Sequence, residues 1–267
     1  MIQALYTGAS GLTGQQRNID VISNNVANIN TDGFKASRFD FQDCLYLRMQ
    51  SPVDNSPQKN LQRGAGTFEY QIAKLFLQGP LRDTGRALDF AIEGNGFFIV
   101  ENPNPLDEYD GMDEILYTRS GNFYVSPEVE GETGGYLVDS AGRFILSTDG
   151  DRIFITDPAA LSVSSEGLLS QTDAQGVVTE IAYLGLMDFT NRQGLAAVGD
   201  NLYMVTDNSG EEVEVAATVR GNSLEASNVD YGGEITRLIR AQRAYQLATR
   251  CISTADQMMQ QVNNIRT

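Results

Sequence analysis

Apolar residues recur every seven positions near the start of the chain. They fill one heptad position and the position three residues after it: Leu5, Leu12, Ile19 and Val26, then Ile22 and Ile29. This spacing is typical of a helix that carries one apolar seam. The turn formers Asn30-Thr31-Asp32-Gly33 follow, and Gly33 is free to adopt a positive φ. The pattern predicts a helix over residues 3–29, about 40 Å long.

The end of the chain carries a second heptad seam. One seam position is large four times and the other is small four times: Leu238, Tyr245, Ile252 and Met259, against Ala241, Ala248, Ala255 and Val262. Small residues at alternate seam positions let a partner helix approach closely. We expect Asn228 to cap this helix and Asp230 to lie in its first turn, where an acid meets the helix dipole. With no Pro or Gly after Gly233, the helix is expected to run to about residue 265.

Other apolar residues of this second helix fall outside the seam. They are Ile235, Ile239, Leu247, Met258 and Ile265. A simple two-helix hairpin packed on the protein's own core would leave them in water, because each helix of a pair covers one stripe only. Burial on several sides is therefore expected, either by the β part of the chain or by other subunits.

The middle of the chain has the pattern of β-structure. Two pairs of short apolar runs flank the turn sequences Glu93-Gly94-Asn95-Gly96 and Asp139-Ser140-Ala141-Gly142, and each predicts a hairpin. Further short strands are expected at 123–125, 153–155, 161–164, 177–189, 202–206 and 212–219. Residues 35–63 are intermediate, with a helix or an extended arm to Met49 and then a polar loop.

These patterns predict an α+β protein. Paired long N- and C-terminal helices, similar to a coiled coil, carry a mainly antiparallel all-β middle domain. The expected domains are a terminal helical assembly domain at 1–29 and 228–267, a connecting region at 30–63, and a β-rich domain at 64–227. Within the helical domain, the fourteen seam residues named above are the predicted assembly interface.

Composition removes several classes of function. The 267 residues contain no His, which excludes a Ser-His-Asp triad and any His-ligated metal site. The net charge of −16 argues against a nucleic-acid partner, since no Lys/Arg surplus exists to neutralise phosphates. Residues 101–150 alone carry 11 acids and 2 bases. We interpret the acidic run 107–114 as an exposed loop, because it lacks the spacing of a calcium-binding EF-hand.

Two smaller features complete this part of the analysis. Cys44 and Cys251 stand in no CxxC motif, and each is expected to be a small buried apolar residue, although a bridge between them stays open. Residues 1–14 lack the apolar core of a secretory signal peptide. We therefore expect a cytoplasmic protein or one that leaves the cell without a cleaved signal.

Five motifs then stand in a fixed order along the chain. They are 24–35 (NNVANINTDGFK), 93–100 (EGNGFFIV), 117–123 (YTRSGNF), 224–230 (LEASNVD) and 241–245 (AQRAY), followed by the tail 254–258 (TADQM). Together they resemble the bacterial flagellar rod and hook protein family over the whole chain. The family signature falls on Asn24, Asn25, Asn28, Asn30, Thr31, Gly33 and Phe34 at the start, and on Gln242, Arg243 and Ala244 near the end. Length and the stretch 39–49 are most similar to the distal-rod members, since a hook protein would carry a further outer domain.

This resemblance implies a structural subunit and no enzyme, without cofactor, metal or small-molecule substrate. Such subunits polymerise helically into the axial drive shaft that crosses the periplasm and transmits torque to the hook. The implied partners are further copies of the chain, neighbouring rod and hook proteins, the outer-membrane and peptidoglycan ring proteins, and the flagellar type III export apparatus. The implied location is the rod of the basal body, reached without a cleaved signal peptide.

Three alternatives stay open beside the distal rod. Another, proximal rod protein of the same family is the close competitor. A glycan-binding β domain on a helical stalk would need no polymer. An enzyme that cleaves peptidoglycan would need two carboxylates as acid and base, and no carboxylate pair in the sequence stands out for that role.

Overall fold

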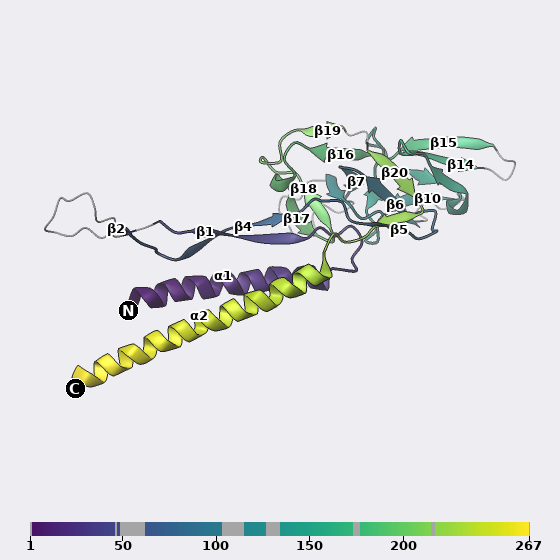
Figure 1. The fold of residues 1–267 in the computed structure, drawn as a ribbon. Coiled ribbons are helices and arrows are strands. Elements are labelled where there is room, and N and C mark those ends of the chain that lie inside the picture. Colours follow the sequence, from purple (N-terminus) through teal and green to yellow (C-terminus); the bar gives the residue numbers. More distant parts are fainter. Residues whose placement is uncertain are drawn as a thin grey trace. The chain divides into compact units, whose positions relative to one another are not determined.

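The computed structural model describes residues 2–45, 47–48, 62–102, 115–126, 134–172, 177–214 and 217–266. The chain divides into two compact units. We call them the helical unit, made of Met1–Ala27, Ser37–Leu75 and Asp230–Thr267, and the β unit, made of Asn28–Ala36 and Phe76–Val229 (Figure 1). Long helices in one unit and antiparallel strands in the other confirm the predicted α+β class.

The helical unit is built on two long helices that pack against each other. Helix α1 spans Ile2–Ala27 and helix α2 spans Tyr231–Arg266. Helix α1 begins and ends within two residues of the predicted bounds 3–29, and α2 ends within two residues of the predicted end at residue 265. Their approach is close, because a Cβ added at Gly8 of α1 would lie 3.0 Å from Cγ1 of Ile252 in α2.

A long two-stranded ribbon also belongs to the helical unit. Strand β1 (Ser37–Asp43) runs antiparallel to β4 (Thr67–Lys74), with a bulge after Asp40, and β2 (Leu47–Arg48) pairs with β3 (Gln62–Arg63). The ribbon lies along α1, where a Cβ at Gly14 would come within 2.9 Å of the Phe41 ring. The extended form of segment 37–43 is the one observed. Residues 64–75, predicted as part of the β-rich domain, group with the helices, and the predicted domain division itself stays a prediction.

The β unit contains one large antiparallel sheet and smaller ones. Among the described residues the main path runs β12-β10-β11-β7-β8-β18-β17, with β16 and β9 joined to β7 and β10, and β19 to β16. Its strands are β7 (Phe97–Glu101), β8 (Ile115–Thr118), β9 (Tyr124–Ser126), β10 (Gly135–Val138), β11 (Phe144–Ile145), β12 (Phe154–Ile155), β16 (Leu186–Phe189), β17 (Ala196–Gly199), β18 (Leu202–Met204) and β19 (Glu212–Glu214).

Smaller sheets complete the β unit. Strands β13 (Leu161–Val163), β14 (Leu168–Thr172) and β15 (Val178–Tyr183) form one of them. Two further pairs join late strands to early ones: β20 (Thr218–Gly221) lies on β6 (Phe90–Glu93), and β21 (Ser223–Glu225) lies on β5 (Leu81–Asp83). Short 3-10 turns at Pro158–Ala160 and Arg192–Gly194 connect strands.

One of the two predicted hairpins is confirmed and the other is wrong. Strands β10 and β11 pair antiparallel across the 139–142 turn, where Asp139 Oδ1 accepts a hydrogen bond from the Ala141 amide at 2.8 Å. Strands β6 and β7 flank the 93–96 turn as predicted, but they do not pair with each other. β6 pairs with β20 instead, while β7 enters the main sheet.

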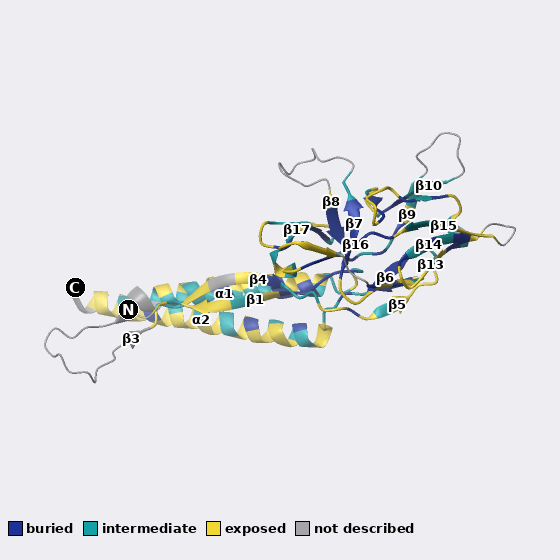
Figure 2. Ribbon diagram, turned by 90° about the horizontal axis from the view of Figure 1, so that it is seen from above, coloured by how far each residue is buried: buried dark blue, intermediate teal, exposed yellow. Residues whose placement is uncertain are grey.

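The core of the β unit is apolar and rich in aromatic rings. Fully buried side chains include Phe90, Phe97, Phe98, Phe123 and Tyr203. The Phe98 and Phe123 ring centroids are 5.2 Å apart at a steep angle, an arrangement that aromatic quadrupoles favour. Figure 2 shows dark, buried strands concentrated in this unit, whereas the helices are mostly half-buried or exposed.

Three smaller predictions meet different outcomes. Asn228 does not cap α2, which begins at Tyr231, because its side chain bonds elsewhere. The two thiols are free, with Cys251 exposed and Cys44 half-buried, so the expected burial of both is wrong. The acidic loop 103–114 lies outside the described residues.

No described helix is long and apolar enough to cross a membrane, and the described residues form no cluster of metal ligands.

Candidate functional site

The predicted assembly residues lie on the helices with graded burial. Ile22, Ala241 and Ala255 are buried. Most of the others are half-buried: Leu5, Leu12, Ile19, Val26, Leu238, Tyr245, Ala248, Ile252 and Met259. Val262 is exposed, and Ile29 lies beyond the end of α1 in the β unit, half-buried. The pairing of α1 with α2 thus leaves much of both seams partly open to solvent.

Several large apolar side chains outside the seam stay in water in this chain. Leu247 is 61% exposed, Met258 46% and Ile239 46%. Tyr6 of α1 is exposed as well. Ile235 is half-buried, and nothing is described for the side chain of Ile265. These residues form no part of the chain's own core, and repeated exposed apolar side chains on one helix mark a surface for a partner.

A groove opens between α1, β1 and α2 inside the helical unit. It holds about 450 Å³, and its floor includes Val21, Ile22 and Phe39. Ala241 and Ala244 of α2 lie along it, and arginines at 38, 237 and 240 line its edge. Its lining thus combines apolar side chains with three arginines and the carboxylate of Glu234.

Asn25 of the family signature joins three elements of the helical unit. Its side-chain amide donates to Ser37 O at 2.8 Å and accepts from Ser37 N at 2.9 Å. The same amide lies 3.4 Å from a carboxylate oxygen of Glu234 in α2, whose other oxygen accepts from Arg237. All of Asn25 is buried. The Asn25 side chain can both donate to and accept from Ser37 because an amide carries a donor NH₂ group and an acceptor oxygen.

The rest of the first signature shapes the segment that follows α1. Thr31 donates to the Asn28 side chain at 3.2 Å, and Asn30 is exposed. Gly33 adopts φ +74°, which confirms the prediction, and its amide donates to Glu225 O at 2.7 Å. Phe34 is buried. In the last motif, Gln242 and Arg243 are exposed and Ala244 borders the groove, while Asn24 is exposed on α1.

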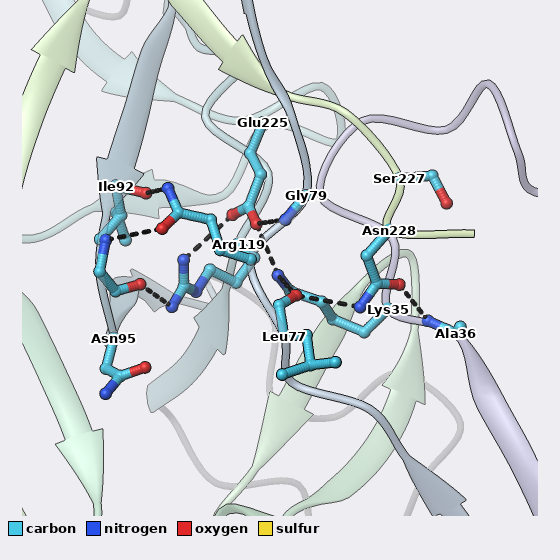
Figure 3. Close-up of polar contacts among 12 residues, drawn as sticks. Lys35, Ala36, Leu77, Gly79, Ile92, Asn95, Arg119, Glu225, Ser227 and Asn228 are labelled. Atoms are coloured by element: carbon cyan, nitrogen blue, oxygen red, sulfur yellow. Dashed lines mark hydrogen bonds and ion pairs between the residues drawn. The ribbon is translucent and has the colours of Figure 1, made fainter. Parts of the chain in front are cut away.

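A buried cluster of charges lies within the β unit (Figure 3). Glu225 accepts from Lys35 Nζ at 2.6 Å through one carboxylate oxygen and from Arg119 Nη1 at 3.0 Å through the other. Gly79 N donates to the first oxygen at 2.7 Å. Lys35 also donates to Leu77 O at 2.9 Å, and Arg119 donates to Gly94 O at 2.7 Å. We call Lys35, Arg119 and Glu225 the buried charge cluster.

Burial in this cluster is nearly complete and its charges are not balanced. The side chains of Lys35 and Glu225 are 1% exposed and that of Arg119 is 3% exposed. Desolvation lowers the pKa of Lys35, and the Glu225 carboxylate opposes that effect. Desolvation lowers the pKa of Arg119 in the same way. A single carboxylate therefore holds two cations, and Arg119 Nε has no hydrogen-bond partner among the described residues.

The three residues of the cluster and Gly94, whose carbonyl accepts from Arg119, come from four of the five sequence motifs. Lys35 ends the first motif, Gly94 belongs to the second, Arg119 to the third and Glu225 to the fourth. The sequence analysis quoted these residues within motifs and assigned them no role. No local pattern in the sequence marks these three charged residues as buried. Identifying the partner required the fold, because sequence separation gave no indication of it.

Three family models match separate parts of the chain. Residues 5–35 match the family model described as flagella basal body rod protein, residues 91–180 match the flagellar hook protein FlgE/F/G D1 domain, and residues 220–265 match the flagellar basal body rod FlgEFG protein C-terminal model. The second of these regions contains Arg119 and the third contains Glu225, both from the buried charge cluster.

Relatives that align over most or all of the chain are flagellar basal-body rod proteins as well. A flagellar basal-body rod protein FlgG of Caulobacter vibrioides is 38% identical over 279 aligned positions, covering 99% of this chain and all of the relative. FlgG of Bacillus subtilis strain 168 is 34% identical over the full length of both. A basal-body rod protein FlgF of Caulobacter vibrioides is 35% identical over 92% of this chain and 90% of its own length.

Proposed function

This chain belongs to the flagellar basal-body rod protein family, and we propose that it assembles helically through α1 and α2 as a subunit of the distal rod. It is a structural protein of the flagellar basal body and not an enzyme. The two FlgG relatives described above match over 99% or more of the chain, which favours the distal position. The FlgF relative keeps a proximal position as the second candidate.

The observation that carries the assembly surface is the exposed apolar face of α2. Leu247 and Met258 lie in water in the single chain, although side chains of this size gain about 1.5–3 kcal/mol each on full burial. In a helical polymer each subunit meets neighbours through different faces, and such heterologous contacts do not close into a ring. Neighbouring copies would cover these residues, and the seams of α1 and α2 would continue as coiled-coil-like contacts in an inner tube.

Other partners follow from the same proposal. The axial position gives the chain neighbouring rod and hook proteins at its two ends. The β unit would face outward, toward the ring proteins of the outer membrane and peptidoglycan. Delivery through the flagellar type III export apparatus, without a cleaved signal peptide, belongs to the same proposal.

Substitution of the exposed apolar residues tests the assembly surface. We expect Leu247→Ser and Met258→Ser together to abolish rod completion and motility, while thermal unfolding of the isolated chain is unchanged because both side chains are already in water. The matched control is Gln246→Ser with Gln257→Ser, which alters two exposed neighbours without removing apolar area. Normal rods with the apolar pair removed would refute this surface.

Localisation tests the position along the rod separately. Cryo-electron microscopy of purified basal bodies should place the chain next to the hook and inside the outer rings. Density for the chain at the opposite, inner end of the rod would favour the proximal candidate. Saturable binding of glycan strands by the chain, with no incorporation into basal bodies, would overturn the rod proposal itself.

A further inference from the structure

The last segment of the β unit is built into its core. We call residues 217–229 the strap. Its buried side chains are Ala217, Val219, Ser223, Leu224, Glu225 and Ser227. Among the described residues, strand β20 of the strap pairs with β6 alone, and β21 pairs with β5 alone. The strap therefore supplies the partner strand to two edges that are formed about 130 residues earlier in the chain.

Backbone approach along the strap is unusually close at one point. A Cβ added at Gly79 would lie 2.0 Å from Ala226 O, so no larger residue fits beneath the strap. Ala226 N donates to Pro80 O at 2.9 Å. Asn228 then bridges two segments, accepting from Ala36 N at 2.7 Å and donating to Leu77 O at 2.9 Å. The strap is thus held by backbone hydrogen bonds along its length, in the manner of an extended peptide added to a sheet edge.

Glu225 gives this strand addition its specificity. It is the only acidic residue of the strap, and it enters a pocket that contains Lys35 Nζ, Arg119 Nη1 and Gly79 N. Without Glu225 the two cations would remain buried with no opposing charge in contact. Removal of Glu225 is strongly unfavourable, because it takes the shared carboxylate away from two buried cations. Removal of one cation costs less, because the other cation still pairs with Glu225.

The pocket and its ligand are far apart in the sequence. Glu225 lies 190 residues after Lys35 and 106 residues after Arg119. A chain is synthesised from its N-terminus, so the cations and the β5 and β6 edges exist before the strap does. Until residue 229 is present, these edges have no partner of their own.

We propose that the strap completes the β unit as the partner strand of β5 and β6, and that Glu225 gives this pairing its specificity. The edges of β5 and β6, together with the cationic pocket, form a strap-binding site that can bind the same segment in trans. Its ligand is an extended peptide with the spacing of Val219, Leu224 and Glu225. Occupation in cis keeps the site closed in the finished subunit. A chain that lacks the strap keeps two open strand edges and a dicationic pocket.

The test uses the whole chain, cut after it has folded. Specific protease sites are inserted after residues 216 and 229, and both are cleaved in the native protein. A synthetic, fluorescently labelled peptide of the sequence 217–229 is then exchanged against the resident strap. Its affinity is measured by anisotropy, and hydrogen exchange reports protection of the β5 and β6 amides.

Three peptides separate specific recognition from general strand pairing. We expect the native peptide to bind and to restore protection in β5 and β6. A peptide with Glu225→Gln should bind about 100-fold more weakly, because it leaves two buried cations unpaired. A peptide with Arg220→Gln, which removes an ion pair exposed on both sides, should lose less than about fivefold.

The uncut chain provides an independent readout. In full-length Glu225→Gln, the amides of β5, β6 and the strap should exchange together and faster, whereas Lys35→Met should have a smaller effect because Arg119 still pairs with Glu225. Equal losses for the Glu225 and Arg220 peptides would overturn the role of the charge. Unchanged protection of β5 and β6 after the strap is removed, or failure of the native peptide to rebind, would overturn the completing strand.

Discussion

The two units of this chain bury their apolar residues by different means. The β unit has a closed apolar core rich in aromatic rings, whereas the helical unit leaves Leu247, Met258 and Phe68 exposed. Charge divides in the same way. The helical unit carries 11 Lys/Arg and 8 Asp/Glu, a net +3, and the β unit carries 8 Lys/Arg and 27 Asp/Glu, a net −19.

This difference separates a part that folds by itself from a part that is completed by neighbours. Most helix stability in proteins comes from packing of an apolar face, so helices with open faces gain stability on assembly. A strongly charged unit resists non-specific association with like units. The contrast therefore matches a subunit whose β unit is finished before assembly and whose helices are finished by it.

The largest expected effect compares the same substitution in the two units. Phe98→Ala in β7 removes a fully buried ring and should lower the free energy of unfolding of the β unit by about 3–5 kcal/mol. Phe68→Ala in β4 removes an exposed ring and should change stability by less than about 0.5 kcal/mol. Chemical denaturation followed by hydrogen exchange would resolve both.

A reversed order would break the comparison. If Phe68→Ala destabilised the isolated chain as much as Phe98→Ala, the helical unit would already have a closed core of its own. The exposed face of α2 would then lose its meaning as an assembly surface.

An effect of intermediate size concerns the hydrogen bonds between Asn25 and Ser37 inside the helical unit. Asn25→Ala leaves the amide and carbonyl of Ser37 without their partner in a buried site, which costs about 1–3 kcal/mol. We expect faster hydrogen exchange in α1, β1 and the start of α2, with the β unit unaffected. The control is Gln16→Ala, an exposed amide of α1, for which no change is expected. Loss of protection in the β unit would show that the two units do not unfold separately.

The sequence predicted the elements far better than their partners. The heptads identified both helices to within two residues, because an apolar period of seven reports directly on a helix face. Short strands were found where apolar runs meet turn residues. Pairing was harder: β6 was assigned to β7 by proximity, yet its partner β20 lies about 130 residues away. Nothing local in Phe90–Glu93 encodes that choice.

The buried charge cluster escaped prediction for the same reason. Lys35, Arg119 and Glu225 each look like ordinary surface charges in their own segments, and only the fold brings them together. Asn228 failed as a cap because its amide satisfies Ala36 and Leu77, contacts that outcompete a local bond to the helix start. The first strand of the ribbon was left open between a helix and an extended arm, and its pairing with β4 was not predicted, because exposed Phe41, Phe68 and Ile72 obscure the alternation of a strand.

The smallest expected effect is the pH dependence of the two units. With no His in the chain, unfolding free energy should be nearly flat between about pH 5 and 8. Hydrogen bonds from Arg152 and Arg192 help to lower the pKa of Glu101 and Asp188, both in the β unit. A carboxyl with a lowered pKa binds fewer protons when folded, so its contribution is lost as the pH falls through that pKa. Acid should therefore remove this stabilisation from the β unit.

On the alkaline side each unit has one lysine that titrates early. Desolvation lowers the pKa of Lys35 in the β unit and of Lys74 in the helical unit. Each lysine binds fewer protons folded than unfolded, so rising pH favours the folded state until both forms are neutral. Burial raises the pKa of Tyr203, which reverses this trend for the β unit once unfolded tyrosine ionises near pH 10. Lys35→Met should abolish the alkaline gain in the β unit alone, as measured by hydrogen exchange of each unit across pH 8–10. A gain that persists there in Lys35→Met would show that the buried charge cluster is not its source.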